Sequence, residues 1–146
     1  MDMNRMTQKS QEAIQAAQAL ATRFGHVEVD GEHLLLALLE QEDGLVSRLI
    51  QRLDIDLEVF IAAVRSELQR LTSVSGPGVE PGKVYVTQRF NQLLVKAESE
   101  AKQLKDDCIS VEHLLLAMTD EGSKTAAGNI FQQFNLTRDR LLQVLT

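Results

Sequence analysis

The sequence predicts an all-α protein in which two pseudo-symmetric repeats of four helices, eight helices in all, pack into one domain. Two observations lead to this prediction. Six residues, Glu32–Ala37 (E-H-L-L-L-A), recur unchanged at Glu112–Ala117, at an offset of 80 positions. Apolar residues also recur at spacings of three and four, the helical period, along most of the chain. A repeat at a fixed period is typical of a duplicated structural unit.

The register of the repeat continues outside these six residues. Thr7-Gln8 corresponds to Thr87-Gln88 at the same offset, and a chain of 146 residues has the usual length of a single domain. We expect the repeats to pack with approximate two-fold symmetry and to leave a groove at their junction near the linker. The expected divisions are one domain at 1–146, a first repeat at 7–71, a linker at 72–86 and a second repeat at 87–145.

Capping residues place the helices of the first repeat. Thr7 is a suitable N-cap for the first helix, and Gly25 is suited to end it. Asp30 suits the N-cap of a second helix, which is apolar on every side from Leu34 to Leu39 and is therefore expected to be buried. A short third helix is expected after a break at Gly44, and a fourth after an N-cap at Asp56.

The linker and the second repeat follow. Residues 72–86 contain both prolines and three glycines. Val84–Val86 has extended character, but we expect three residues to be too few for a sheet. The second repeat then follows the plan of the first, with N-caps at Thr87, Ser110 and Thr137 and a short helix in the region of Gly122 and Gly128.

Composition and charge exclude several classes of function. A net charge of −6 and a pI of about 5.0 argue against nucleic acid and anionic membranes as partners. No apolar run approaches the roughly 18 residues of a membrane-spanning helix. Met1–Met6 lacks the apolar core of a signal peptide. With Cys108 as the only cysteine, we expect a cytoplasmic protein without a disulfide.

Signatures of nucleotide binding, metal binding and nucleophilic catalysis are incomplete. Gly82-Lys83 is followed by Val84, not by the Ser or Thr of a P-loop. His33 and His113 lack the second His that a zinc helix needs four residues away, so we expect partly buried histidines with local hydrogen bonds. Acidic neighbours disfavour a thiolate, so we expect Cys108 to be a small buried residue.

The acidic residues also have structural explanations. Glu32 and Glu112 lie in first helical turns, where the helix dipole alone can account for a negative charge. Phe90 and Leu94 fit either the core or the lining of a groove, and the helical pattern favours the core. Solvated surface charge is expected for the other acidic clusters, which are Glu40/Glu42/Asp43, Asp106/Asp107 and Asp120/Glu121.

Three segments carry a family resemblance: T-Q-K-S-Q-E-A-I at Thr7–Ile14, V-E-V-D-G-E-H-L-L-L-A-L-L at Val27–Leu39 and I-S-V-E-H-L-L-L-A-M at Ile109–Met118. They resemble the Clp repeat, the double four-helix module at the N-terminus of Clp ATPases. The resemblance extends from Met1 to about Leu145. The segments Leu68–Leu71 and Val74–Gly76 are similar to the ClpB group within that family.

The resemblance implies a function and a set of site residues. ClpB-type proteins are hexameric ATP-driven disaggregases that work with the DnaK chaperone system, and their N-terminal module engages exposed apolar segments of unfolded or aggregated polypeptides. Equivalents of Thr7, Asp106 and Glu112 are linked to this role in the family, with Asp107 as an alternative to Asp106. Leu94 matches one position in the lining of a shallow apolar groove. The full expected substrate-binding set is Thr7, Phe90, Leu94, Asp106, Glu112 and His113.

We therefore expect a substrate-engaging module that is not catalytic, has no cofactor or metal of its own and is a monomer in isolation. The end at Leu142–Thr146 has no tail, which suggests that ATPase modules binding ATP lie outside this sequence. Met3 and Met6 are expected to offer adaptable apolar contacts, and acidic residues to favour clients with basic residues. Two alternatives remain: an adaptor-docking module of the ClpA/ClpC type, and a hydrolase or metal enzyme.

Overall fold

The computed structural model describes residues 3–71 and 83–145. Within these residues the chain forms eight α-helices, so the predicted fold class is confirmed. The first repeat contains α1 (Gln8–Arg23), α2 (Gly31–Glu40), α3 (Leu45–Arg52) and α4 (Leu57–Arg70). The second contains α5 (Gln88–Gln103), α6 (Val111–Thr119), α7 (Ala126–Gln133) and α8 (Arg138–Leu145). A 3-10 turn, η1 (Met3–Arg5), and two short strands, β1 (Glu28–Val29) and β2 (Tyr85–Val86), complete these elements.

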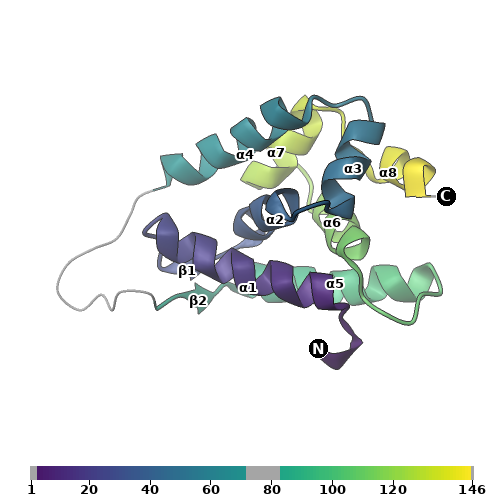
Figure 1. The fold of residues 1–146 in the computed structure, drawn as a ribbon, viewed down its shortest axis with the longest axis horizontal. Helices are drawn as coiled ribbons and strands as arrows, with labels where there is room; N and C mark the ends of the chain where they lie inside the picture. Colours follow the sequence, from purple (N-terminus) through teal and green to yellow (C-terminus); the bar gives the residue numbers. More distant parts are fainter. Residues whose placement is uncertain (1–2, 72–82, 146) are drawn as a thin grey trace.

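The two L-L-L helices form the centre of the molecule. In Figure 1, α2 and α6 lie between α1 and α5 on one side and α4 and α7 on the other. Every residue of α2 from Gly31 to Leu39 is buried, which confirms the expectation drawn from its apolar surface. The surrounding helices have one apolar face each, and they cover the central pair with it.

The predicted helix caps are present. The Oγ1 atoms of Thr7 and Thr87 accept hydrogen bonds from the backbone N–H groups of Ser10 and Phe90, at 3.2 and 3.0 Å. Asp56 caps α4 in the same way, and Gly25 has the positive φ of 76° that favours glycine after a helix. These contacts join residues close in sequence, which is why the sequence alone predicts them.

A small sheet joins the two repeats and corrects one expectation. β2 pairs in parallel with β1, with Tyr85 opposite Glu28 and Val86 opposite Val29. The expectation that Val84–Val86 is too short for a sheet was wrong, because its partner strand comes from the other repeat. A parallel bridge also joins Met6 and Ile109, which correspond to Val86 and Val29 at the offset of 80. Each repeat therefore enters its first helix through an extended segment paired with the other repeat.

Cys108 also departs from expectation. Its side chain is exposed, whereas the next residue, Ile109, is fully buried. Successive side chains of an extended segment point to opposite sides, and the pairing with Met6 turns Ile109 inward. Cys108 consequently faces solvent.

Aromatic residues and a close backbone contact hold α4, α7 and the loop before α7. The Phe60 ring lies parallel to Phe131, with centroids 6.3 Å apart, and edge-on to Phe134 at 5.1 Å.

Gly128, inside α7, lies directly against the loop that contains Gly122. A Cβ atom at Gly128 would lie 1.7 Å from the carbonyl oxygen of Gly122. The loop can approach α7 this closely only because residue 128 lacks a side chain.

We predict that Gly128→Ala destabilises the domain by about 1–3 kcal/mol, the usual cost of overpacking. Helix propensity alone would favour alanine by about 1 kcal/mol, so the two effects differ in sign. Urea unfolding followed by circular dichroism measures the change, with Asn129→Ala, an exposed position on the same helix, as the control. A Gly128→Ala variant as stable as the original protein would show that the loop does not need this close contact.

Candidate functional site

The two E-H-L-L-L-A copies begin with the same capping arrangement. Nδ1 of His33 accepts a hydrogen bond from the backbone N–H of Asp30 at 2.9 Å, and Nδ1 of His113 accepts one from Ser110 at 2.8 Å. Nδ1 is therefore unprotonated in both rings, and Nε2 carries the hydrogen. These contacts confirm the predicted local hydrogen bonds. Both imidazoles are almost fully buried, whereas the sequence predicted partial burial.

The Nε2–H groups of these histidines have different partners. His33 donates to Nδ1 of His26 at 2.8 Å, whereas His113 donates to Oδ2 of Asp106 at 2.8 Å. Position 26 corresponds to position 106 at the offset of 80. Both repeats thus keep the hydrogen bond from the histidine Nε2. The acceptor is the buried imidazole of His26 in the first repeat and the carboxylate of Asp106 in the second.

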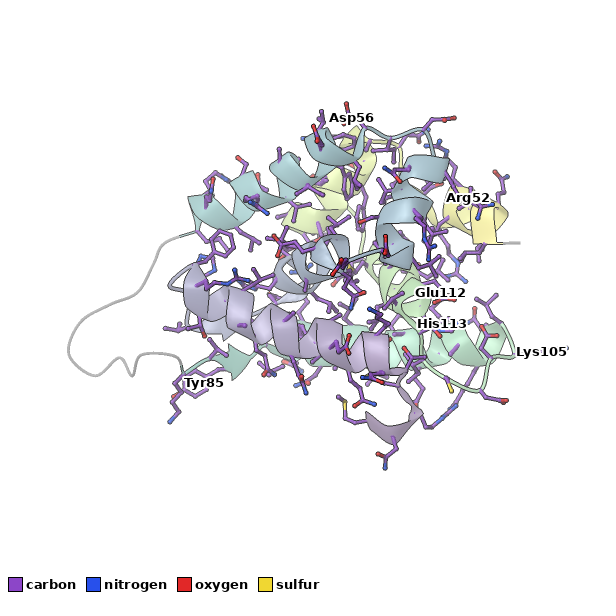
Figure 2. The ribbon with its side chains drawn as sticks, viewed as in Figure 1. Arg52, Asp56, Tyr85, Lys105, Glu112 and His113 are labelled. Carbon is purple, nitrogen blue, oxygen red and sulfur yellow. The ribbon has the colours of Figure 1, made fainter. Side chains whose placement is uncertain are left out.

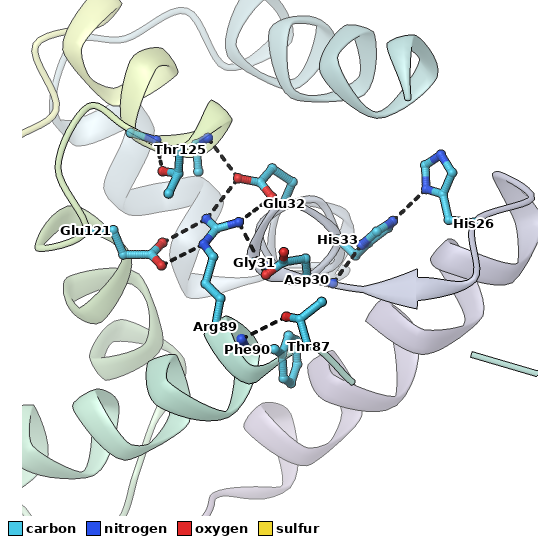
Figure 3. Close-up of polar contacts among 12 residues, drawn as sticks. His26, Asp30, Gly31, Glu32, His33, Thr87, Arg89, Phe90, Glu121 and Thr125 are labelled. Carbon is cyan, nitrogen blue, oxygen red and sulfur yellow. Dashed lines mark hydrogen bonds and ion pairs between the residues drawn. The ribbon is translucent and has the colours of Figure 1, made fainter. Parts of the chain in front are cut away.

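The glutamates before these histidines differ more strongly. Figure 3 shows Glu32 facing the guanidinium of Arg89, which α5 contributes from the other repeat. Nη1 and Nη2 of Arg89 donate to the two carboxylate oxygens of Glu32 at 2.8 and 2.9 Å. The same guanidinium donates twice to Glu121, at 2.8 and 2.9 Å. The backbone N–H of Ala127 also donates to Glu32, at 3.0 Å.

The pKa shifts reflect this network. Burial by itself would raise the pKa of the Glu32 carboxyl, but the hydrogen bond and charge of Arg89, with the Ala127 N–H, lower it overall. Burial alone would also lower the pKa of Arg89, and its hydrogen bonds to Glu121 and Glu32 raise it instead. Both groups are therefore charged at neutral pH, and they join the repeats through a partly buried bidentate pair.

Glu32 and Glu121 both differ from what the sequence predicts. The helix dipole alone does not explain Glu32, because its carboxylate is buried and paired with Arg89. Glu121 is not solvated surface charge, because it holds the other side of the same guanidinium. Comparing Lys9 with Arg89 at the offset of 80 would have singled out position 89 as different. Nothing in the local sequence indicates its partners.

Glu112 occupies the position of Glu32 in the second repeat, but its surroundings are open. Its side chain is half-buried and has no hydrogen bond or ion pair within the described residues. Lys9, the counterpart of Arg89, lies instead 3.9 Å from Glu12 on its own helix. Figure 2 shows Glu112 and His113 together at the start of α6. The same motif is therefore closed by an internal cation in one repeat and left open in the other.

Four of the six predicted site residues gather around the start of α6. The backbone N–H of Thr7 donates to the carbonyl oxygen of Ile109 at 3.0 Å, so Thr7 lies beside the segment that leads into α6. Asp106, whose side chain is 50% exposed, accepts the hydrogen bond of the buried His113. We call the surface formed by Thr7, Asp106 and Glu112 the α6 face. His113 supports this surface from beneath and does not reach it.

The two predicted apolar site residues are buried. Phe90 is 1% exposed and Leu94 is 8% exposed, both on α5. Met6, expected to offer a flexible contact, is also buried at 3%, whereas Met3 is 42% exposed. The bridge to Ile109 explains the burial of Met6. Among the described residues, Met3 is therefore an exposed apolar side chain close to Thr7 in the sequence.

A hollow of about 460 Å³ does lie at the junction of the repeats, between α4 and α7. Its lining is largely polar, and none of the six predicted site residues, including the apolar Phe90 and Leu94, lines it. The lining includes Glu67, Arg70, Lys124, Asn129 and Gln133. The hollow is polar because Phe60 and Phe131 lie on the inner, apolar sides of α4 and α7.

In residues 3–71 and 83–145, no three His, Cys, Asp or Glu side chains are grouped so that they could hold a metal ion. Over the same part of the chain, no helix has both the length and the apolarity needed to cross a lipid bilayer.

The fold defines a class of protein: all-helical domains built from two similar four-helix repeats. A family model described as the Clp repeat (R) N-terminal domain matches residues 5–134, and the chain belongs to this family. It is thus a non-catalytic domain. Its fold resembles that of the Hsp104 N-terminal domain from Candida albicans, with a TM-score of 0.78 at 22% identity over 94% of this chain and 87% of that one.

Within the family, the chain is of the ClpB-like type. It is 47% identical to the chaperone protein ClpB of Nitratidesulfovibrio vulgaris and 49% identical to that of Bacillus cereus, over 99% of its length in both cases. It spans only 17% and 16% of the length of these two proteins.

We predict that Arg89→Met destabilises the domain by about 3–5 kcal/mol at neutral pH, because Glu32 and Glu121 are left without their cation. Lys9→Met, the corresponding change in the first repeat, is the matched control and should cost less than about 1 kcal/mol. Urea midpoints measured by circular dichroism compare the two. Equal losses would contradict the conclusion that the two glutamates differ in their surroundings.

Acid is predicted to destabilise the domain through His33. Burial, followed by the charge of His26, lowers the pKa of the His33 imidazole from 6.5 to about 4. The unfolded chain therefore binds a proton more readily than the folded one, and stability is lost as the pH falls from 6.5 to about 4. The loss amounts to about 3 kcal/mol, at about 1.4 kcal/mol per pH unit.

The variant His33→Gln tests this assignment. Gln at this position can still accept the hydrogen bond from Asp30 but does not titrate. The variant should show little change in urea midpoint between pH 6.5 and 4.5, and only below that range should the lowered pKa of Glu32 add its own loss. His113→Gln is the matched control and should keep the pH dependence. An unchanged slope in His33→Gln would assign the effect to another group.

Proposed function

We propose that this domain is the substrate-engaging module of a ClpB-type ATP-dependent disaggregase and that the α6 face holds exposed apolar segments of unfolded or aggregated polypeptides. The observation that carries the proposal is the open state of Glu112, set against the closed state of Glu32. Similarity to ClpB chaperones over 99% of the chain supports the type of protein. The local geometry supports the position of the contact.

The first repeat indicates what Glu112 can bind. There, a guanidinium satisfies the glutamate through two parallel hydrogen bonds. A basic side chain of a client can satisfy Glu112 in the same way, with the half-exposed Asp106 nearby to add negative charge. The α6 face therefore favours client segments in which Arg or Lys lies beside apolar residues.

The expected affinity is low. A partly exposed ion pair contributes about 0–1 kcal/mol, and apolar contact adds about 25 cal/mol per Å² of buried apolar surface. Met3 supplies apolar surface directly, whereas Leu94 and Phe90 can take part only if α5 shifts away from the core. Weak contact that depends little on client sequence suits a module that must release and rebind its clients.

The rest of the proposed activity belongs to the complete protein. There, hexameric ATPase rings bind ATP and move the polypeptide, in cooperation with the DnaK chaperone system in the cytoplasm. We propose that the isolated domain is a monomer with no cofactor of its own. Its contribution is to raise the local concentration of client segments near the rings.

We predict that a permanently unfolded polypeptide, such as a reduced and carboxymethylated protein, shifts the NMR signals of Thr7, Asp106 and Glu112 on titration. Glu112→Ala should weaken this binding about twofold to fivefold, in line with the loss of one partly exposed ion pair. Glu58→Ala is the matched control, because Glu58 is an exposed glutamate in the first turn of α4.

Two outcomes would contradict the proposal. One is equal affinity of the Glu112→Ala and Glu58→Ala variants for the unfolded polypeptide. The other is binding of a folded protein in a 1:1 ratio with no shifts from the unfolded one, which would favour the adaptor-docking alternative.

A further inference from the structure

A second surface feature lies in the first repeat, away from the α6 face. It is a hollow of about 220 Å³ between the end of α1, the middle of α2 and the second half of α4, and we call it the α1–α4 notch. Its floor is apolar, and is formed by Leu20, Phe24 and Leu36. Its rim is charged, and includes Arg23, Glu40 and Arg65.

The size of the notch suits one large apolar side chain. A cavity of about 150 Å³ lined by apolar residues is enough to hold a benzene ring. The α1–α4 notch exceeds that volume, and Leu20 and Leu36 in its floor are almost fully buried. A Phe or Leu side chain entering from solvent would therefore fit, and its apolar surface would be removed from water.

The rim of the notch carries an unbalanced positive charge. Arg65 donates to Glu40 at 2.6 Å, so these two charges compensate each other. Arg23 has no ion pair within the described residues. The notch therefore has a net positive rim in a chain whose net charge is −6, which favours a carboxylate beside the apolar side chain.

The second repeat has no such apolar floor at the corresponding position. At the offset of 80, Leu20 corresponds to Glu100, which is 1% exposed and forms an ion pair with Arg138 of α8. In the second repeat, the ion pair of Glu100 and Arg138 thus lies where the first repeat has the apolar floor of the notch. The notch is accordingly a feature of the first repeat and not a consequence of the duplicated fold.

A buried polar group lies next to Phe24, in the floor of the notch. His26 stacks on Phe24, with ring centroids 5.6 Å apart and an angle of 12° between the planes. Its Nδ1 accepts the hydrogen bond from His33, so Nε2 carries the hydrogen, and this buried group has no acceptor in the described structure. Figure 3 shows the outer nitrogen of His26 pointing away from His33. His26 is not among the residues that line the notch, so this donor is not part of the contact with an occupant.

We propose that the α1–α4 notch is a second docking site, and that its occupant is a Phe or Leu side chain flanked by Asp or Glu in an extended, unfolded polypeptide. The apolar side chain fills the floor, and the neighbouring carboxylate pairs with Arg23. This site does not depend on Glu112, and its charge preference is opposite to that of the α6 face. Together the two sites would let one domain engage client segments of either charge.

Fluorescence anisotropy with short labelled peptides tests the proposal. The probe is a ten-residue peptide with one central Phe between two Glu residues, and the comparison peptides replace Phe by Ser or both Glu by Lys. Arg23→Glu should weaken binding of the acidic probe about fivefold, as expected for replacing attraction by repulsion at an exposed site. Arg52→Glu, the same charge change at an exposed position on α3, is the matched control.

The expected pattern is specific in three respects. The Ser peptide should lose binding, Arg52→Glu should leave the affinity for the acidic probe unchanged, and Glu112→Ala should also leave it unchanged. Phe24→Ala, with its fold checked by circular dichroism, should weaken binding by removing part of the floor. Equal effects of Arg23→Glu and Arg52→Glu would overturn the proposal, as would a loss of acidic-probe binding in Glu112→Ala. If the α6 face did not bind unfolded polypeptide, this pattern for the notch would still be expected.

Discussion

The pair between Arg89 and Glu32 is the interaction on which the arrangement of the two repeats depends. Arg89 lies on the first helix of the second repeat, and Glu32 lies in the first turn of the central helix of the first repeat. Glu121 accepts from the same guanidinium and the N–H of Ala127 donates to Glu32, so four segments of the chain meet in one network. A group of charges this deep requires all of its members, because removing one leaves the others buried without compensation.

Duplication followed by local divergence accounts for both proposed binding surfaces. The capping arrangement of His33 and His113 is the same in both repeats, which shows that the common framework has been kept. Arg89 closes the glutamate of the first repeat and leaves that of the second open. Conversely, the pair between Glu100 and Arg138 takes the place of an apolar floor in the second repeat, and the first repeat keeps its notch. In each case, an internal ion pair occupies the position in one repeat, and the corresponding position in the other repeat is open to a binding partner.

The candidate site was predictable only in part. The family resemblance selected Thr7, Asp106 and Glu112, and the structure brings these three positions to one surface. The helical pattern placed Phe90 and Leu94 in the core, and both are buried there. Arg89 and the notch were missed, because each is assembled from side chains of several helices. Cys108 was misjudged because its orientation depends on the pairing of its neighbour with Met6.

By itself, the sequence determined the helices, their caps, the central position of the two L-L-L helices and the duplication, because these depend on residues within a few positions of one another or on a repeated pattern. Only the tertiary structure decided the pairing of β1 with β2, the partner of each glutamate and the exposure of each site residue. The physical reason is distance along the chain. Arg89 and Glu32 are 57 positions apart, and no local preference records which distant side chain will satisfy a buried charge.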